Sequence, residues 1–487
     1  MKRLKRAVGL SVIATLVAVM PVLALTEAET VEPLITEGMA ISDSSTTSED
    51  EPMVQSKVNS GKQVRQLYLE DAPLVEKYLL DGRLKDGDRA LTAHLKLHVK
   101  DDQARFGLGV LQFLRALEEL GQALTLYGLR THNGHGLILP FLQLPATSNE
   151  NCKKIDYLQA RQIVDNLQKQ LLEAETTLAL VTDGDVKLPL HFAMIKLDFN
   201  GTSKHLSLSK EDDDSRSLWK LYAKLTNNKD IPITKAEEFY IKFDRGDVHW
   251  LRGYCHVLST ICDIYLAHDS KELFDRTAHV FFNKVDSPYQ VLSKDQRNSD
   301  LGEDKLVFLD LIALLHLIRC DVVEPNRMAS ALNHMQAVID QSRESWKWIM
   351  AETDDDHEWL PNPRQTGVIP NARVTESMVV AWSEIMNESE KILKGELLIP
   401  FWRDSANELL GDIDSSSESE HPRKVVGRGI NLRKVFLEPR QFDLVLWAQG
   451  SAALPYLEKG KLTKGQTWKD LRGQFGNHFP GFALWFN

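Results

Sequence analysis

One stretch of the chain, Gln103 to Tyr127, is apolar on nearly every side when it is drawn as a helix. Its apolar residues fall at helical spacings on several faces: Phe106, Leu108, Val110, Leu111, Phe113, Leu114, Leu117, Leu120 and Leu124. A helix of this kind is stable only when neighbours cover it all round. The run from Leu306 to Ile318 has the same character. The sequence therefore predicts a multilayer helical protein with buried central helices.

Helical spacing of apolar residues extends over most of the chain. Nine runs show it clearly: Val64 to Leu80, Asp88 to Val99, Gln103 to Tyr127, Ile155 to Leu180, Asp247 to His268, Glu303 to Cys320, Pro325 to Ala351, Thr375 to Leu393 and Phe442 to Leu457. Residues that favour helix starts or ends flank several of these runs: Asp88, Asp101, Asp156 and Pro325 at starts, and Gly82, Gly128 and Gly395 after ends. The agreement of the two signals supports a mainly α fold.

Residues 186–199 differ, because their polarity partly alternates and they end in Asn200-Gly201. This pattern predicts a small β-hairpin. The segment Leu91 to Tyr127 resembles a single tetratricopeptide-like helical hairpin, but no second copy follows at about 34 residues. We therefore expect a mainly α, multi-helix globular bundle, weakly repeat-like in its helical hairpins, with one β-hairpin insertion near 186–199. A genuine repeat array is the minor alternative.

The N-terminus has the layout of a secretory signal peptide. Four basic residues precede an apolar run from Ala7 to Met20, and small residues end the segment at Ala24. A membrane anchor is the alternative, but the apolar run of 14 to 19 residues is short for a bilayer-spanning helix, which needs about 20. The first cysteine is Cys152, so no lipid acceptor lies near the cut. We expect a soluble, exported protein, periplasmic or extracellular, without membrane attachment after cleavage.

Composition changes along the chain predict its organisation. Two segments rich in Ser, Thr and Glu are too poor in apolar residues to form a core. The predicted order is a signal peptide at 1–24, a disordered leader at 25–62, a helical body at 63–410, a flexible acidic and Ser-rich loop at 411–424, and an aromatic-rich segment at 425–487. We expect the last segment to pack on the helical body, because so many aromatic side chains are rarely left in water. A partner-docking surface is the alternative.

The charge of the chain argues against nucleic acid as a partner. The full sequence has 58 Lys and Arg and 69 Asp and Glu, and cleavage after Ala24 leaves 54 basic and 69 acidic side chains, a net charge of −15. Such a surface repels phosphate backbones.

Four cysteines are too few for a disulfide framework in a chain of this size. Cys255 and Cys262 are too far apart on one helix to pair together, and buried free thiols are as plausible as pairs with the other two cysteines.

The most concentrated polar chemistry lies between Glu352 and Arg364, directly after the predicted helix that ends at Ala351. Three consecutive carboxylates and an imidazole there predict a divalent-metal site or, together with Glu358, a general acid/base pair. The predicted metal ligands are Asp354, Asp355, Asp356 and His357. Arg364 is a candidate to bind an anionic ligand. Carboxylates at a helix C-terminus oppose the helix dipole unless a cation or an arginine compensates. The alternative is a solvated acidic helix end.

A second candidate is a polar line along one predicted helix, formed by His249, His256 and Asp263. These residues recur every seven positions, so successive members lie about 10 Å apart and no single ion can bind all three. Each needs a partner from another helix, and Asp310 and His316 in the apolar run are candidates. Either these residues bind a ligand, or they form a structural polar network inside the core.

No nucleotide-binding or serine-hydrolase motif occurs in the sequence. His94 and His98, four apart on a predicted helix, could hold a metal, but a polar helix face is the simpler interpretation. We predict a non-enzymatic module that binds a small ligand or a protein, with no cofactor required and a divalent metal as a possibility. The alternative is a metal-dependent enzyme that uses the acidic loop from Asp354 to Glu358.

Overall fold

The protein is mainly helical in the computed structural model, as its periodicity predicts. The structure describes residues 72–130, 149, 151–201, 216–220, 236–237, 239–293, 303–368, 373–403, 428–476 and 479. The predicted signal peptide, leader and loop 411–424 lie outside these residues. The described α-helices are α3 (Glu76–Asp81), α4 (Leu84–Leu97), α5 (Asp102–Leu126), α6 (Tyr157–Ala179), α10 (Arg245–Ala267), α11 (Lys271–Phe281), α12 (Glu303–Leu317), α13 (Pro325–Ala351), α14 (Glu376–Leu393), α16 (Leu432–Leu437), α17 (Leu444–Gln449) and α18 (Gly465–Gly473).

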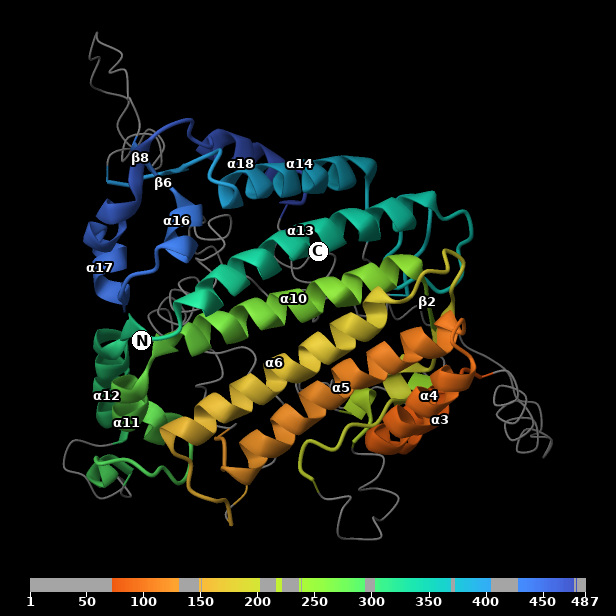
Figure 1. Cartoon of the computed structure of the whole chain (residues 1–487), viewed down its shortest axis with the longest axis horizontal. Helices are drawn as coiled ribbons and strands as arrows, with labels where there is room; N and C mark the ends of the chain where they lie inside the picture. The colour runs from red at the N-terminus through yellow and green to blue at the C-terminus, as the bar shows by residue number, and fades with distance from the viewer. Residues whose placement is uncertain are drawn as a thin grey trace, which may run out of the picture.

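Four long helices lie side by side in the order in which they follow one another along the chain: α5, α6, α10 and α13 (Figure 1). Helix α4 packs against α5 at one side of this row, and α14 packs against α13 at the other. Helix α18 in turn contacts α14. The row of four helices therefore forms the centre of the described structure, and the neighbouring helices pack against its two sides.

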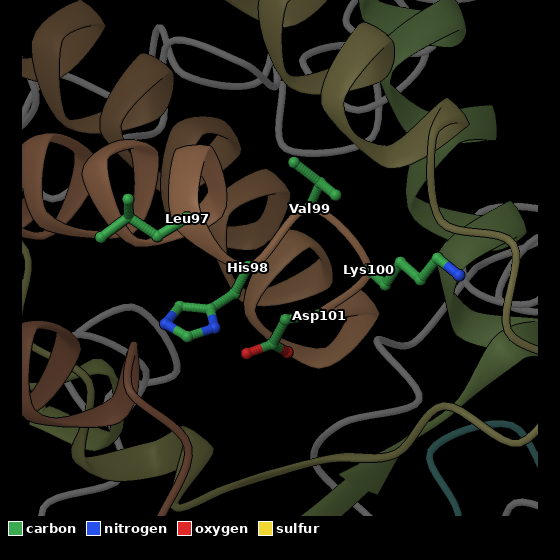
Figure 2. A pocket seen from close by; sticks show the side chains of 5 residues that line it. All are labelled: Leu97, His98, Val99, Lys100 and Asp101. Carbon is green, nitrogen blue, oxygen red and sulfur yellow. The ribbon is translucent and has the colours of Figure 1, made fainter.

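Side-chain caps explain where several of these helices begin. Asp101, between α4 and α5, accepts a hydrogen bond from the backbone N–H of Ala104 (Figure 2). Asp156 and Asp244 each form a capping box at the start of α6 and α10. These contacts satisfy N–H groups that have no partner within the helix. Asp88 does not cap a helix, because α4 begins at Leu84 and encloses it.

The strands form three small antiparallel sheets: β1 (Leu188–Leu190) with β2 (Ile241–Phe243), β3 (His268–Asp269) with β4 (Arg319–Val322) and β7 (Phe442–Asp443), and β5 (Ile399–Pro400) with β6 (Arg428–Ile430) and β8 (Leu457–Lys459). The predicted hairpin near 186–199 is therefore only half right. Strand β1 exists, but its partner is β2, far along the chain, and a 3-10 helix (Phe192–Met194) follows β1. Leu188 and Leu190 are fully buried, so core packing rather than a local turn selects the partner.

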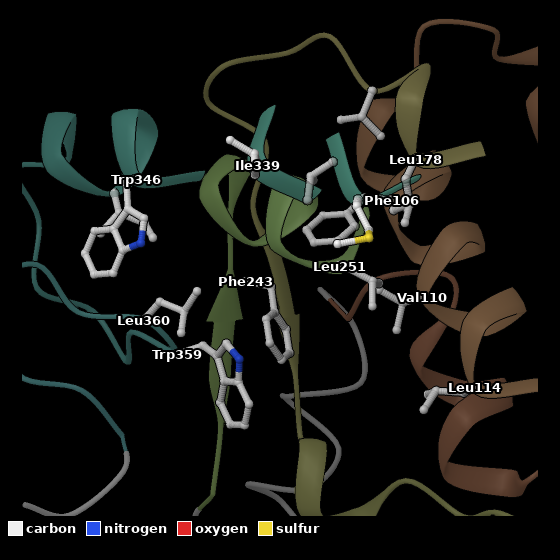
Figure 3. Close-up of a cluster of buried hydrophobic side chains, with 14 of the residues drawn as sticks. Phe106, Val110, Leu114, Leu178, Phe243, Leu251, Ile339, Trp346, Trp359 and Leu360 are labelled. Atoms are coloured by element: carbon white, nitrogen blue, oxygen red, sulfur yellow. The ribbon is translucent and has the colours of Figure 1, made fainter. Parts of the chain in front are cut away.

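The main hydrophobic core lies between the four long helices and continues over the β1–β2 sheet. In Figure 3, Phe106 and Val110 of α5 face Leu251 of α10. Below them, Phe243 of β2 packs on Trp359, whose ring centroid is 6.0 Å away. Aromatic and aliphatic residues from the end of the chain belong to the same buried cluster: Leu432, Phe436, Trp468, Phe475 and Phe479.

Helix α12 departs from the expectation of a second buried helix. Leu314 is its one buried residue among those whose side chains are described, whereas Phe308, Leu309 and Ile312 are each about half exposed. Its main helical neighbours are α11 and α17, which cover only part of its surface.

In the described part of the chain, no helix combines the length and apolar character needed to cross a bilayer.

All four cysteines are buried free thiols: Cys152, Cys255, Cys262 and Cys320. Burial raises the pKa of Cys262 to about 12 and that of Cys320 to about 11. A protonated thiol is a poor nucleophile and a poor metal ligand. The cysteines therefore act as small apolar residues in this fold.

Candidate cation site

The four predicted metal ligands do not gather around one point. Asp354 lies 3.3 Å from the ammonium of Lys187. Asp355 is exposed and accepts a hydrogen bond from the backbone N–H of Thr366. Asp356 forms an ion pair with Lys242 and lies 2.8 Å from Nδ1 of the exposed His357.

Three other carboxylates do converge at this end of the molecule: Asp244, Glu352 and Glu358. One oxygen from each lies within 4.8 Å of the others, and this is the one group of three or more ligand-type side chains so close together in the described residues. Asp244 is 5% exposed and Glu358 is 2% exposed, while Glu352 is half-buried. An ion held at about 2.0 to 2.6 Å from each oxygen needs ligand atoms no more than about 5 Å apart. The spacing meets that requirement.

The three carboxylates come from two helix ends and the connector that follows α13. Asp244 is the N-cap of α10, where its Oδ1 accepts from the backbone N–H groups of Gly246 and Asp247. Glu352 directly follows the last residue of α13. The carboxyls of Glu352 and Asp244 lie within hydrogen-bonding reach of each other. Glu358 reaches the same place because the connector turns back.

Hydrogen bonds to the end of α13 hold this connector in place. Asn362 is buried and donates to the carbonyl of Ile349. Arg364 donates to the carbonyls of Met350 and Glu352, at 3.1 and 3.2 Å. Arg364, predicted as a ligand-binding residue, thus caps the helix and offsets the negative end of its dipole.

The cluster is strongly unbalanced in charge. Burial is the largest effect that raises the pKa of Glu358 and Glu352, and the neighbouring carboxylate of Asp244 adds to it. A fourth carboxyl, Asp247, is 4% exposed, and burial together with Asp244 and Glu358 raises its pKa well above the usual range. Against these acids stands the ammonium of Lys187, 3.5 Å from Asp244.

Asp247 also has an unfilled acceptor. Its Oδ2 accepts a hydrogen bond from the backbone N–H of Asp244, but its buried Oδ1 has no hydrogen-bond partner among the described residues. Buried carboxylate oxygens nearly always have a partner, so each exception needs an explanation. Hard oxygen ligands of this kind suit Ca²⁺, Mg²⁺ or Mn²⁺ rather than softer metals.

The second predicted constellation is separate from this cluster. His249 contacts Gln341 of α13, with Nδ1 2.8 Å from Oε1. His256 contacts His334 of α13, and Asp263 accepts from Gln168 of α6. The expected partners therefore come from other helices, but these helices are α6 and α13 rather than α12.

The apolar helix α12 directs its polar residues elsewhere. Asp310 lies 3.2 Å from Nε2 of His279 on α11, and His316 is exposed. These groups do not converge with His249, His256 or the acidic loop. Asp310 therefore pairs with α11, whereas His249 and His256 pair with α13.

A surface hollow lies at the turn between α4 and α5, lined by Leu97, His98, Val99, Lys100 and Asp101 (Figure 2). The rings of His94 and His98 stack with centroids 4.4 Å apart, and His94 Nε2 lies 2.8 Å from Asp101 Oδ2. Because Asp101 also caps α5, its carboxylate is already engaged on both oxygens. The hollow is a polar turn rather than a metal site.

Sequence reasoning missed Asp244 and Asp247, although both lie in a recognisable capping box at the start of α10. That signal identifies a helix start and says nothing of the distant helix end that it meets. Comparison with known proteins adds no assignment, since no family model, no curated protein sequence and no solved structure matches this chain.

Proposed function

We propose that this is an exported, non-enzymatic binding protein whose helical body is locked by a divalent cation, Ca²⁺ foremost, held by Asp244, Glu352 and Glu358. The observation that carries the proposal is the convergence of these three carboxylates within 4.8 Å.

The energetic argument starts from the cost of buried charge. Moving an unpaired carboxylate out of water is expensive, so such a group either takes up a proton or is paired with a cation. Lys187 supplies one positive charge to a group of four buried or half-buried carboxyls. A bound Ca²⁺ would neutralise two more charges and would join the start of α10 to the end of α13. The function of the bound Ca²⁺ is then to hold the connector from Glu352 to Val368 in place.

Burial of the ligands favours a structural ion over a catalytic one. A catalytic metal keeps a coordination position open to substrate. Asp244 and Glu358 expose 5% and 2% of their surface, which leaves little access for a substrate. The alternative, a metal-dependent enzyme, is favoured by the exposed His357, which lies next to Asp356 at the edge of the cluster.

The test is cation binding by the purified full chain after treatment with a chelator. Thermal unfolding and calorimetric titration with Ca²⁺, Mg²⁺ and Mn²⁺ should show binding and a higher melting temperature. A ligand present at 100 times its Kd stabilises the folded state by about 2.7 kcal/mol. Binding that is undetectable for all three ions at millimolar concentration contradicts the proposal.

Two variants make this test specific. Glu358→Gln should abolish the stabilisation by Ca²⁺, yet it should make the cation-free protein more stable by about 1 to 2 kcal/mol, because a buried acid is removed. Asp355→Asn is the matched control, since this side chain is exposed and can still accept from Thr366. An equal loss of the Ca²⁺ effect in both variants would place the ion elsewhere.

Bound Mn²⁺ distinguishes the structural from the catalytic alternative. An ion that is fully enclosed by protein oxygens has no exchangeable water, so binding should lower its effect on the relaxation rate of bulk water protons well below that of free Mn²⁺, which is fully hydrated. A strongly enhanced rate would show an open coordination position. That result would favour the enzyme.

A further inference from the structure

A second buried polar cluster lies in the seam between α6, α10 and α13, apart from the candidate cation site. It is a chain of four side chains: Glu175, His256, His334 and Asp263. The two Nδ1 atoms of the histidines are 2.9 Å apart. His256 Nε2 lies 3.6 Å from Glu175 Oε1, and His334 Nε2 lies 3.8 Å from Asp263 Oδ2. Each imidazole is thus placed between the other imidazole and a carboxylate.

The short contact between the imidazoles limits how many protons the pair can hold. A hydrogen bond between two ring nitrogens needs one donor and one acceptor, so only one of the two Nδ1 atoms is protonated. A neutral pair satisfies this condition with two protons. A third proton can be placed on an Nε2 that faces a carboxylate. A fourth proton would set two N–H groups against each other, and the 2.9 Å contact could not persist.

The charged groups around the pair do not favour a second imidazolium. On α6, Glu175 is paired with Arg252 of α10 at 2.8 Å. Asp263 of α10 is paired with Arg327 of α13 at 3.2 Å. The two carboxylates that face the histidines are therefore already matched by two guanidinium groups.

The next carboxylates around the pair are also matched by cations. Glu324 is paired with both Arg327 and Arg161. Gln168 of α6 donates to Asp263, and Asp165 of α6 is paired with Arg327 and Lys169. Burial raises the pKa of the Cys255 and Cys262 thiols well above the usual range, which favours their neutral form. Burial, followed by the charge of His256, lowers the pKa of His334.

We propose that the contact between His256 and His334 is an acid-operated latch between α10 and α13, closed while the pair holds at most three protons and opened by the fourth. The latch is independent of the cation site, because its groups lie in the middle of the two helices and contact none of the three proposed ligands. Its effect is to loosen α13 from α10 as the surroundings become acidic.

The sign of the pH dependence follows from the lowered pKa of His334. The unfolded chain takes up a proton near the ordinary histidine pKa of about 6.5, and the folded chain does so only at lower pH. The stabilising contribution of the pair is therefore complete above about pH 6.5 and declines as the pH falls through the folded pKa. Acid should open the seam and base should not.

Hydrogen exchange of the full chain at pH 7 and pH 5, corrected for the intrinsic pH dependence of exchange, tests the latch. We expect the protection of amides in α13 to fall at pH 5, because the folded pair resists the proton that the unfolded chain accepts. In His334→Gln the neutral amide can still bond to His256, so the protection should be the same at both pH values. His98→Gln is the control, because His98 is exposed and is distant in the sequence from both His256 and His334.

Two results would overturn the latch. One is a wild-type protein whose α13 protection is unchanged at pH 5. The other is His334→Gln with the same acid-induced loss as the wild type. If His334→Gln does not fold, His256→Gln answers the same question from the other side of the contact.

Discussion

Two clusters of buried charge lie along the same pair of helices, α10 and α13, and they are built differently. In the middle of the pair, Glu175 and Asp263 are matched by Arg252 and Arg327. At the end of the pair, three carboxylates converge around Asp244, and Lys187 is the ammonium beside them. Burial of charge is common to both clusters, so burial alone does not indicate a ligand. The excess of carboxylates over cations at the end of the pair is what indicates a bound cation there.

The balanced cluster should be the more sensitive to loss of one partner. We expect Arg327→Met to destabilise the protein by about 3 kcal/mol, because Asp263, 1% exposed, would keep a buried charge without its guanidinium. Urea unfolding at pH 7 measures the change. Lys347→Met is the control, since its pair with Glu344 is exposed and should contribute less than about 1 kcal/mol. Equal effects of the two substitutions would show that the central cluster is not a stabilising network.

Glu118, a buried acid in the described part of the chain whose hydrogen-bond donor is a backbone N–H, sharpens the comparison. Glu118 of α5 accepts from the backbone N–H of Asp198, and burial raises its pKa to about 7. A raised pKa means that the folded state favours the protonated form, so the contribution of this group is present below about pH 4.5 and is lost as the pH rises through 7.

Glu118→Gln should therefore stabilise the protein by about 2 kcal/mol at pH 9 and have little effect at pH 5. Chemical denaturation at the two pH values measures the difference. Glu396→Gln, at an exposed position, should show no such pH dependence. A Glu118→Gln variant that is equally stable relative to wild type at both pH values would contradict the assigned burial effect.

The smallest expected effect concerns Lys187, which competes with a cation for the unbalanced cluster. Lys187→Met should tighten Ca²⁺ binding about fivefold, because a positive charge 3.5 Å from Asp244 is removed and such a pair contributes about 1 kcal/mol or less. Calorimetric titration measures the affinity. Lys242→Met removes a charge that pairs with Asp356 instead, so it should change the affinity less. Identical affinities for wild type and Lys187→Met would separate Lys187 from the cation site.

Local signals in the sequence predicted most of the helices. The run at Gln103 to Tyr127 became α5, from Asp102 to Leu126, and the caps at Asp101 and Asp156 are where they were expected. These features depend on residues within one or two turns of each other. The run at Phe442 to Leu457 is interrupted at Gly450, whose φ of 101° ends α17.

Features that depend on distant segments were not predictable in the same way. The apolar run in α12 resembles that in α5, but burial is set by the neighbours that the rest of the chain provides. The carboxylates of Asp244 and Glu352 meet only because the start of α10 lies beside the end of α13. For His256 and Asp263, the seven-residue spacing indicated that both lie on one helix face and need partners from other helices. Only the packing of the helices shows that these partners lie on α6 and α13.

The order of the four long helices has a consequence for synthesis. Each of α6, α10 and α13 packs against the long helix that was made before it. A chain that emerges from its N-terminus can therefore add one long helix at a time to a structure that already exists, and α10 gains its largest interface when α13, the last of the four, arrives. Assembly in this order keeps the exposed apolar surface of each intermediate small, which limits the time in which unfinished chains can associate with one another.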